Sequence, residues 1–268
     1  ATIRLNVGDF NEVTADQQVF LCVGSAYSYT AALRPAGCTQ TANLVYSWKG
    51  PDGREVSNTK ALVLSDVTTA TAGVYTCTIA GTCGTATLRL TATVYENPVL
   101  SVTPAADTLC EGESVNMSAA VNANAGNYMF EWRHEGLLLG TTVEQHIIRD
   151  VTLSDAGQYV CKVSAHCGED RDTVRLTVRK GLKILNRPAD LTLCKGNAAE
   201  LKVEASGDSV VYAWGGPVAG EWSAPDTAVY RNGSVSQDAT GQYRCVVSSR
   251  CGTDTLYVRV DVEKDLEL

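Results

Sequence analysis

Apolar and polar residues alternate through several short runs of the chain, most regularly between positions 115 and 178. The apolar positions of these runs are Val115, Met117, Ala119 and Val121, then Phe130 and Trp132, then Val174, Leu176 and Val178. A period of two places such side chains on one face of a β-strand, and turn residues separate the runs. The pattern therefore predicts short strands that each bury one face, rather than helices.

A cysteine motif repeats three times along the chain. Tyr-x-Cys is followed six residues later by Cys-Gly, at Cys77 and Cys83, Cys161 and Cys167, and Cys245 and Cys251. Each copy begins 84 residues after the previous one, a period longer than a solenoid repeat and close to the length of one β-sandwich. The spacing predicts three self-contained domains at residues 1–96, 97–180 and 181–268. The joining segments are too short to be flexible tethers, so we expect a semi-rigid rod.

Composition narrows the setting in which the chain works. Ten cysteines in 268 residues, spaced by the repeat and without any Cys-x-x-Cys pair, predict disulfides and an extracellular or cell-surface location. No apolar run approaches the roughly 20 residues that span a bilayer, and no charged-then-apolar leader precedes Ala1. We therefore expect a secreted chain whose export signal has been removed. The formal net charge of -8 disfavours nucleic acid as a partner, because affinity for phosphate backbones rests on basic patches.

The most specific motif runs from Asp155 to Cys161, as Asp-Ala-Gly-Gln-Tyr-Val-Cys, and follows an upstream tryptophan at position 132. It resembles the corresponding motif of the immunoglobulin superfamily. Together with the Cys-x-Gly segment before the second strand, the Tyr-x-Cys-x5-Cys-Gly pattern is similar to immunoglobulin-like repeats of bacterial cell-surface proteins, particularly those of Bacteroidetes. The resemblance implies an all-β fold of three tandem immunoglobulin-like β-sandwich domains. The motif's aspartate is Thr71 in the first domain and Ala239 in the third, so its turn contact is in question there.

The resemblance also implies a disulfide framework. Similar bacterial repeats keep the cysteine of the Cys-x-Gly turn and the cysteine before the hairpin glycine, which suggests that Cys110 bonds Cys167 and that Cys194 bonds Cys251. In the first domain the same scheme gives Cys22 with Cys83, and leaves Cys38 with Cys77 as an approximate sheet-to-sheet bridge. The remaining two, Cys161 and Cys245, would be buried thiols. A competing scheme bonds Cys161 to Cys167 across the hairpin turn.

Groups that could carry out catalysis are scattered along the chain. There is no His-x-His pair, no Gly-x-Ser-x-Gly nucleophile elbow and no glycine-rich phosphate loop. We therefore expect a non-enzymatic chain without catalytic residues, metal or cofactor. Trp48, Trp132 and Trp214 fall on the third strand of each copy, where a sandwich core takes a large aromatic side chain. Trp222 has no counterpart in the other copies and is the candidate ligand contact, with the long loop at 33–43 as the second candidate surface.

These observations predict an extracellular adhesion array or structural spacer of a bacterial surface or secreted protein. It would bind a protein or glycan surface partner through loops or strand edges rather than through a deep pocket. One alternative is an accessory carbohydrate-binding region of a larger secreted enzyme, in which Trp222 contacts sugar. The other is a subunit of a surface filament, which self-associates through its terminal strands.

Overall fold

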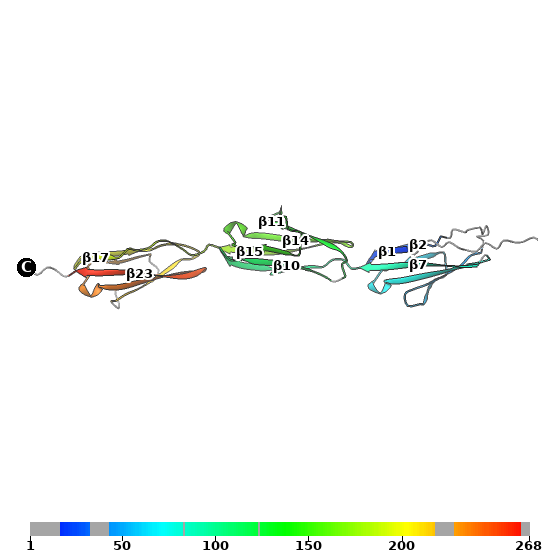
Figure 1. Ribbon diagram of the computed structural model, residues 1–268, viewed down its shortest axis with the longest axis horizontal. Coiled ribbons are helices and arrows are strands. Elements are labelled where there is room, and N and C mark those ends of the chain that lie inside the picture. Colours follow the sequence, from blue (N-terminus) through cyan, green and yellow to red (C-terminus); the bar gives the residue numbers. More distant parts are fainter. Residues whose placement is uncertain (1–16, 33–42, 83, 123, 218–227, 264–268) are drawn as a thin grey trace, which may run out of the picture.

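Three β-sandwiches lie end to end along the long axis of the chain in the computed structural model (Figure 1). The structure describes residues 17–32, 43–82, 84–122, 124–217 and 228–263. Within these ranges the chain forms strands and short 3-10 turns, and no α-helix. The prediction of an all-β chain of three tandem immunoglobulin-like sandwiches is therefore confirmed. The domain boundaries at residues 96 and 180 stay a prediction.

The first domain pairs its first described strand with its last. Its strands are β1 (Gln17–Cys22), β2 (Tyr27–Thr30), β3 (Val45–Lys49), β4 (Glu55–Ser57), β5 (Ala61–Leu64), β6 (Gly73–Gly81) and β7 (Gly84–Tyr95), with the 3-10 turn η1 (Thr69–Thr71) before β6. The larger sheet has the order β1-β7-β6-β3-β4, and β2 pairs with β5 in the second sheet. β1 runs parallel to β7, whereas the remaining paired strands are antiparallel.

The second domain repeats this plan with a fuller second sheet. Its strands are β8 (Leu100–Thr103), β9 (Ala106–Cys110), β10 (Val115–Val121), β11 (Tyr128–His134), β12 (Leu137–Leu138), β13 (Gln145–Ile148), β14 (Gly157–Ala165) and β15 (Gly168–Arg179), with η2 (Leu153–Asp155) before β14. The sheets have the orders β12-β11-β14-β15-β9 and β13-β10-β8. β9 runs parallel to β15, as β1 does to β7.

Within the described residues, the third domain has a four-stranded main sheet, against five strands in the other two domains, and a divided second layer. Its strands are β16 (Lys183–Asn186), β17 (Leu191–Cys194), β18 (Ala199–Lys202), β19 (Glu204–Ser206), β20 (Val211–Gly215), β21 (Val229–Asn232), β22 (Gly241–Ser249) and β23 (Gly252–Glu263), with η3 (Gln237–Ala239) before β22. The main sheet has the order β17-β23-β22-β20, while β16 pairs with β19 and β18 with β21. β17 is again parallel to the last strand, β23.

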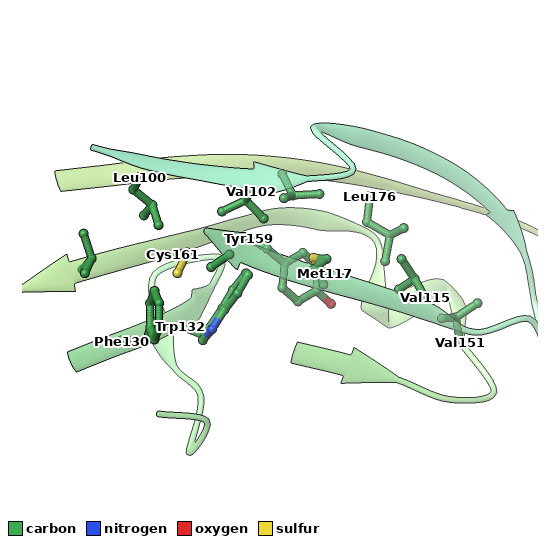
Figure 2. Close-up of a cluster of buried hydrophobic side chains, with 13 residues drawn as sticks. Leu100, Val102, Val115, Met117, Phe130, Trp132, Val151, Tyr159, Cys161 and Leu176 are labelled. Atoms are coloured by element: carbon green, nitrogen blue, oxygen red, sulfur yellow. The ribbon is translucent and has the colours of Figure 1, made fainter. Parts of the chain in front are cut away.

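Each sandwich buries the apolar face that the alternation predicts. In the second domain, Leu100 and Val102 from β8 face Phe130 and Trp132 from β11 across the space between the sheets (Figure 2). Burying such large apolar side chains is the main favourable term for a domain of this size. Trp48 and Trp132 are fully buried, while Trp214 packs partly buried against the third core. The predicted core role of these tryptophans is therefore consistent with where they lie.

A tyrosine anchors the turn before the penultimate strand of each domain, which is β6, β14 or β22. Its hydroxyl donates to the backbone carbonyl four residues earlier, from Tyr75 to Thr71 at 2.9 Å, from Tyr159 to Asp155 at 2.8 Å and from Tyr243 to Ala239 at 2.9 Å. The carboxylate of Asp155 also accepts the backbone N–H of Thr152 at 2.7 Å, and the Thr71 hydroxyl oxygen accepts the N–H of Thr68 at 3.1 Å. Ala239 has no side-chain acceptor. Threonine thus keeps the aspartate's turn contact, and alanine loses it.

Candidate functional site at the domain junctions

The cysteine of the Cys-x-Gly turn occupies the same place in each domain. Parallel pairing sets Cys22 opposite Tyr95, Cys110 opposite Arg179, and Cys194 opposite Glu263. In the first two domains the final strand leads directly into the next domain. These cysteines therefore lie at the end of the sandwich from which the chain leaves, which we call the exit end.

Two backbone hydrogen bonds hold this cysteine turn against the turn before the penultimate strand, which is β6, β14 or β22. The turn glycine has a positive φ in each copy, +79° at Gly24, +90° at Gly112 and +86° at Gly196, a conformation that side chains disfavour. Its N–H donates to a valine carbonyl, from Gly24 to Val67 at 2.7 Å, from Gly112 to Val151 at 2.9 Å and from Gly196 to Val235 at 2.9 Å. The N–H of the same valine donates back, to Ser25, Glu113 and Asn197 respectively. The Cys-x-Gly motif is thus a clamped turn that fixes the position of its cysteine.

The cysteine before the hairpin glycine, Cys167 or Cys251, lies at the opposite end of its sandwich, in the turn between the last two strands. Cys167 directly precedes Gly168 at the start of β15, whereas Cys110 pairs with Arg179 at the far end of that strand. At about 3.3 Å per residue, the strand holds its two ends roughly 36 Å apart. A disulfide requires Cα atoms within about 7 Å. Distance therefore excludes a bond between these two cysteines within one domain.

Both disulfides in the described residues join neighbouring domains instead. Cys22 bonds Cys167, with Cα atoms 5.5 Å apart and a sequence separation of 145. Cys110 bonds Cys251, with Cα atoms 5.6 Å apart and a sequence separation of 141. Each bond ties the exit end of one domain to the hairpin turn of the next. Every described junction is therefore crossed twice by covalent bonds, once by the linker and once by the disulfide.

The disulfide pairing predicted within each domain is wrong. Cys22 bonds Cys167 and not Cys83, and Cys251 bonds Cys110 and not Cys194. In the second and third domains the two cysteines of the predicted pair lie at opposite ends of one sandwich. Cys194 is a free, exposed thiol. Cys38 and Cys83 lie outside the described residues.

The strand cysteines inside the three cores are free thiols. Cys161 and Cys245 are buried and unbonded, as predicted, but the predicted bond from Cys77 to Cys38 is wrong because Cys77 is free. Cys77 lies on the core face of β6 opposite Trp48, enclosed by its own domain. Burial raises the pKa of the Cys77 thiol to about 11 and that of Cys245 to about 11. Burial, with the charge of Asp172, raises the pKa of Cys161 to about 12, so all three thiols stay protonated and unreactive at neutral pH.

The competing scheme across the hairpin is also wrong. Cys161 faces the core from the middle of β14, where its cross-strand neighbour is Asp172. Cys167 lies beyond the end of that strand and bonds Cys22 of the preceding domain. The two sulfurs therefore belong to different environments, one apolar and closed, the other at a domain surface.

Aromatic rings surround the disulfide of the first junction. Tyr95 lies 5.6 Å from His166, centroid to centroid, in an edge-on arrangement, and 6.1 Å from Phe20 in a stacked one. Phe20 and Tyr95 belong to the first domain and His166 to the second. The N–H of Glu96 donates to the carbonyl of Asn124 at 2.9 Å, which adds a backbone contact across the junction. The three rings and Asn127 line a small open pocket of about 210 Å³.

Charged side chains surround the disulfide of the second junction. The carboxylate of Asp208, in the third domain, lies 3.0 Å from the guanidinium of Arg179 in the second domain and 4.0 Å from that of Arg250. The N–H of Asp208 donates to the carbonyl of Lys180 at 3.2 Å, and the N–H of Arg250 donates to the carbonyl of Asp208 at 3.0 Å. One aspartate thus holds the linker, the preceding domain and its own hairpin turn together.

Other candidates give no reactive centre in the part of the chain that the structure describes. Cys22, His166 and Cys167 bring three potential metal-ligand atoms within 4.8 Å of one another. Both sulfurs are consumed by the disulfide, so neither offers a thiolate to a metal. Trp222, the candidate ligand contact, lies outside the described residues, as does the loop at 33–42.

One family model and several curated proteins match the chain. Residues 97–178 match the model described as immunoglobulin domain. The chain is 26% identical over 226 residues to the basement membrane-specific heparan sulfate proteoglycan core protein of Mus musculus, covering 75% of this chain and 6% of that protein. It is 26% identical over 162 residues to hemicentin-1 of Mus musculus, covering 58% and 3%. It is 30% identical over 143 residues to matrix-remodeling-associated protein 5 of Homo sapiens, covering 48% and 5%. The chain thus spans only a small fraction of these relatives' length.

Solved structures agree with the fold. An I-band fragment from titin superposes with a TM-score of 0.70 at 17% identity, covering 94% of this chain and 98% of the fragment. The N-terminal eight immunoglobulin domains of the Down syndrome cell adhesion molecule give a TM-score of 0.57 at 16% identity, covering 94% of this chain and 36% of that one. At such identities the likeness concerns the fold alone. The chain is an array of three immunoglobulin-like domains in series. Among its described residues, no helix has the length and apolarity needed to cross a membrane.

Proposed function

We propose that this chain is a stiff extracellular rod that acts as a spacer or adhesion array, without catalysis. The observation that carries the proposal is the pair of disulfides between consecutive domains, Cys22 with Cys167 and Cys110 with Cys251. A single short linker leaves a domain free to bend and twist about it, as is usual for small interfaces between domains. A second covalent connection across the same junction removes most of that freedom.

The chemistry of the junctions supports an extracellular setting. Disulfides persist in oxidising compartments and are rare where cytosolic thiols keep cysteines reduced. Several curated proteins that match the chain have names that refer to matrix or basement membrane, and one structural neighbour is named a cell adhesion molecule. These names support a role in holding surfaces at a distance or together. We expect the partner to be a protein surface met by loops and strand edges.

The bacterial cell-surface setting is a further part of the proposal. It rests on the resemblance of the Cys-x-Gly and Tyr-x-Cys-x5-Cys-Gly motifs to bacterial repeats. The named curated relatives, in contrast, are animal proteins. The proposed rod-like role does not depend on the source, because its support is the geometry of the junctions.

Small-angle X-ray scattering of the whole chain tests the proposed stiffness. A Cys22→Ser, Cys110→Ser double variant should show a broader distribution of inter-domain distances and a smaller mean end-to-end length than the unchanged chain. A Cys194→Ser variant is the matched control, because it removes a cysteine of the same turn that forms no disulfide. Indistinguishable scattering from the double variant and the control would contradict a role for the disulfides in stiffness. It would leave the fold and the junction contacts untouched.

A further inference from the structure

The third domain has a cysteine turn equivalent to those at the two junctions, but its cysteine forms no disulfide. Cys194 ends β17 as a free, exposed thiol, whereas its equivalents Cys22 and Cys110 each bond the hairpin turn of the following domain. Two equivalent residues in the same chain thus show what this position binds. The partner in both cases is a cysteine that directly precedes the first glycine of a last strand.

The position of Cys194 is prepared in the same way as that of the bonded cysteines. β17 pairs in parallel with β23, which sets Cys194 opposite Glu263, as Cys22 is set opposite Tyr95. Gly196 has φ +86° and donates to Val235 at 2.9 Å, and the N–H of Val235 donates back to Asn197 at 2.9 Å. No rearrangement of this turn is required before a bond forms, so little conformational entropy is lost on bonding.

We propose that the exit end of the third domain is a covalent docking site for a further immunoglobulin-like unit, which bonds Cys194 through the cysteine of its last hairpin turn. The inference rests on the geometry of the two formed junctions and does not need the proposed rod or adhesion role. It identifies the occupant by its chemistry: a sandwich of the same kind, with a cysteine directly before the glycine that opens its final strand.

The residue opposite the cysteine specifies the occupant further. At the first junction this residue is Tyr95, which contacts His166, the residue just before the hairpin cysteine of the next domain. At the second junction it is Arg179, which is separated from the equivalent Arg250 by Asp208. At the docking site it is Glu263, a carboxylate. A basic residue before the hairpin cysteine of the incoming unit would therefore form a direct ion pair with Glu263.

Bond formation requires an oxidant, for which a small-molecule disulfide such as oxidised glutathione is sufficient. The thiolate of Cys194 attacks one sulfur of that disulfide, forming a mixed disulfide and releasing one glutathione thiolate. The thiolate of the incoming cysteine then attacks the sulfur of Cys194 and releases the second glutathione. Two protein thiols lose two electrons and two protons, and one small disulfide becomes two thiols. The buried thiols of Cys77, Cys161 and Cys245 do not compete, because they are enclosed in the cores.

A four-domain chain tests the proposal directly. A second copy of residues 180–263 is inserted after Glu263, which keeps the 84-residue period, and residues 264–268 follow it. The appended unit supplies both required features, the cysteine copied from Cys251 and the basic residue copied from Arg250. After refolding with reduced and oxidised glutathione, peptide mapping without reduction should find Cys194 bonded to the appended Cys251. Finding Cys194 free, or bonded elsewhere, while the bonds of Cys22 and Cys110 are intact would overturn the proposal.

A charge change tests the role of Glu263. With Arg250→Glu in the appended unit, the new disulfide should be reduced about threefold more readily by glutathione, as expected for loss of one exposed ion pair. Arg231→Glu in the appended unit is the matched control, because Arg231 pairs with Glu200 on another face of the domain. If the equilibrium constant for reduction of the new disulfide by glutathione equals that of the control, the assignment of a basic partner residue is overturned.

The unchanged chain gives a test that does not depend on the folding of a fourth unit. Incubated with oxidised glutathione, the native chain should take up one glutathione at Cys194 and none at the three core cysteines, as measured by mass spectrometry of its peptides. A native chain in which Cys194 remains unmodified, while an unfolded control reacts, would show that the thiol is not accessible for docking and would overturn the proposal.

Discussion

At the first junction aromatic rings surround the inter-domain disulfide, whereas at the second an aspartate lies between two arginines. Tyr95 and Arg179 hold equivalent positions, each opposite the bonded cysteine of its own domain. Both reach the next domain, one by ring contacts and the other by an ion pair. The same location thus supports two different kinds of contact.

The comparison separates what the junction requires from what it tolerates. The common elements are the clamped Cys-x-Gly turn, the parallel strand beside the last strand, and the hairpin cysteine of the next domain. The side chains around the bond differ completely. We infer that the disulfide and the short linker fix the relative position of the two domains. The surrounding contacts then adjust the free energy of the interaction between the domains and its dependence on salt.

Removing either disulfide should have the largest effect on its junction. We expect Cys22→Ser and Cys110→Ser each to weaken the interaction between the two domains at that junction. The loss should be about 2–4 kcal/mol, the usual range for a native disulfide. The effect should be similar at both junctions, because the bond is their common element. Hydrogen exchange of the linker amides, at residues 95–97 and 179–182, measures the loosening of each junction. A large effect at one junction and none at the other would show that the surrounding contacts dominate.

Shortening Tyr95 should weaken only the first junction. Tyr95→Ala removes the one ring contact that Tyr95 makes across the junction, to His166, so we expect a loss of about 0.5–1.5 kcal/mol and faster exchange of the N–H of Glu96. The result should not depend on ionic strength. Tyr257→Ala is the control, since Tyr257 is 60% exposed on β23 of the third domain. Equal exchange in both variants would mean that the aromatic contacts add nothing to the disulfide.

Removing the ion pair should have a smaller effect that salt abolishes. Arg179→Ala should cost about 0.2–1 kcal/mol at low ionic strength, as is typical of partly exposed pairs. At 1 M salt the variant and the unchanged chain should exchange their Gly181 amides at the same rate, because a Debye length of about 3 Å screens the pair. Arg231→Ala, which breaks an exposed pair away from the junction, is the control. A difference that persists in high salt would point to packing by the arginine stem instead.

Much of each domain could be predicted from sequence, because a strand's side-chain period is local. The alternation from Val115 to Val121 identified the buried face of β10, and the Tyr-x-Cys motif located the strand and turn anchored by Tyr159. The free thiols of Cys161 and Cys245 were also predicted. These features depend on residues that are near one another in the chain, or on the core of a single immunoglobulin-like domain.

The junctions were missed because they depend on which end of a sandwich each cysteine occupies. The repeat places Cys110 and Cys167 in one domain, and the resemblance to bacterial repeats that keep both cysteines suggested that they bond. The missing information was the parallel pairing of β9 with β15, which carries Cys110 to the exit end. The repeat itself contained a signal. When identical sandwiches follow one another in a rod, the exit end of one domain meets the hairpin turn of the next at every junction. Arg179 and Asp208 gave no comparable signal, because charged residues near a linker are common.

The last prediction concerns the turn that supports the second junction. Hydrogen bonds from the backbone and hydroxyl of Thr152 hold the pKa of Asp155 below its ordinary value. The same turn contains Val151, which clamps Gly112 beside Cys110. A lowered carboxyl pKa contributes stability that is fully present above the unfolded value of about 3.9 and is lost as the pH falls through the lower folded value.

Asp155→Ala reproduces the third domain's alanine and should destabilise the second domain by about 0.5–1 kcal/mol at neutral pH, the usual effect of losing such a cap. The difference should vanish at pH values below the folded pKa, where the carboxyl of the unchanged chain is protonated. Asp155→Thr reproduces the first domain's turn and should keep most of the stability without the acid dependence, since Thr71 makes the same contact with a neutral hydroxyl. Urea unfolding of the three chains across the acid range measures both effects. An alanine variant whose deficit is unchanged in acid would show that the turn depends on side-chain packing rather than on the carboxylate.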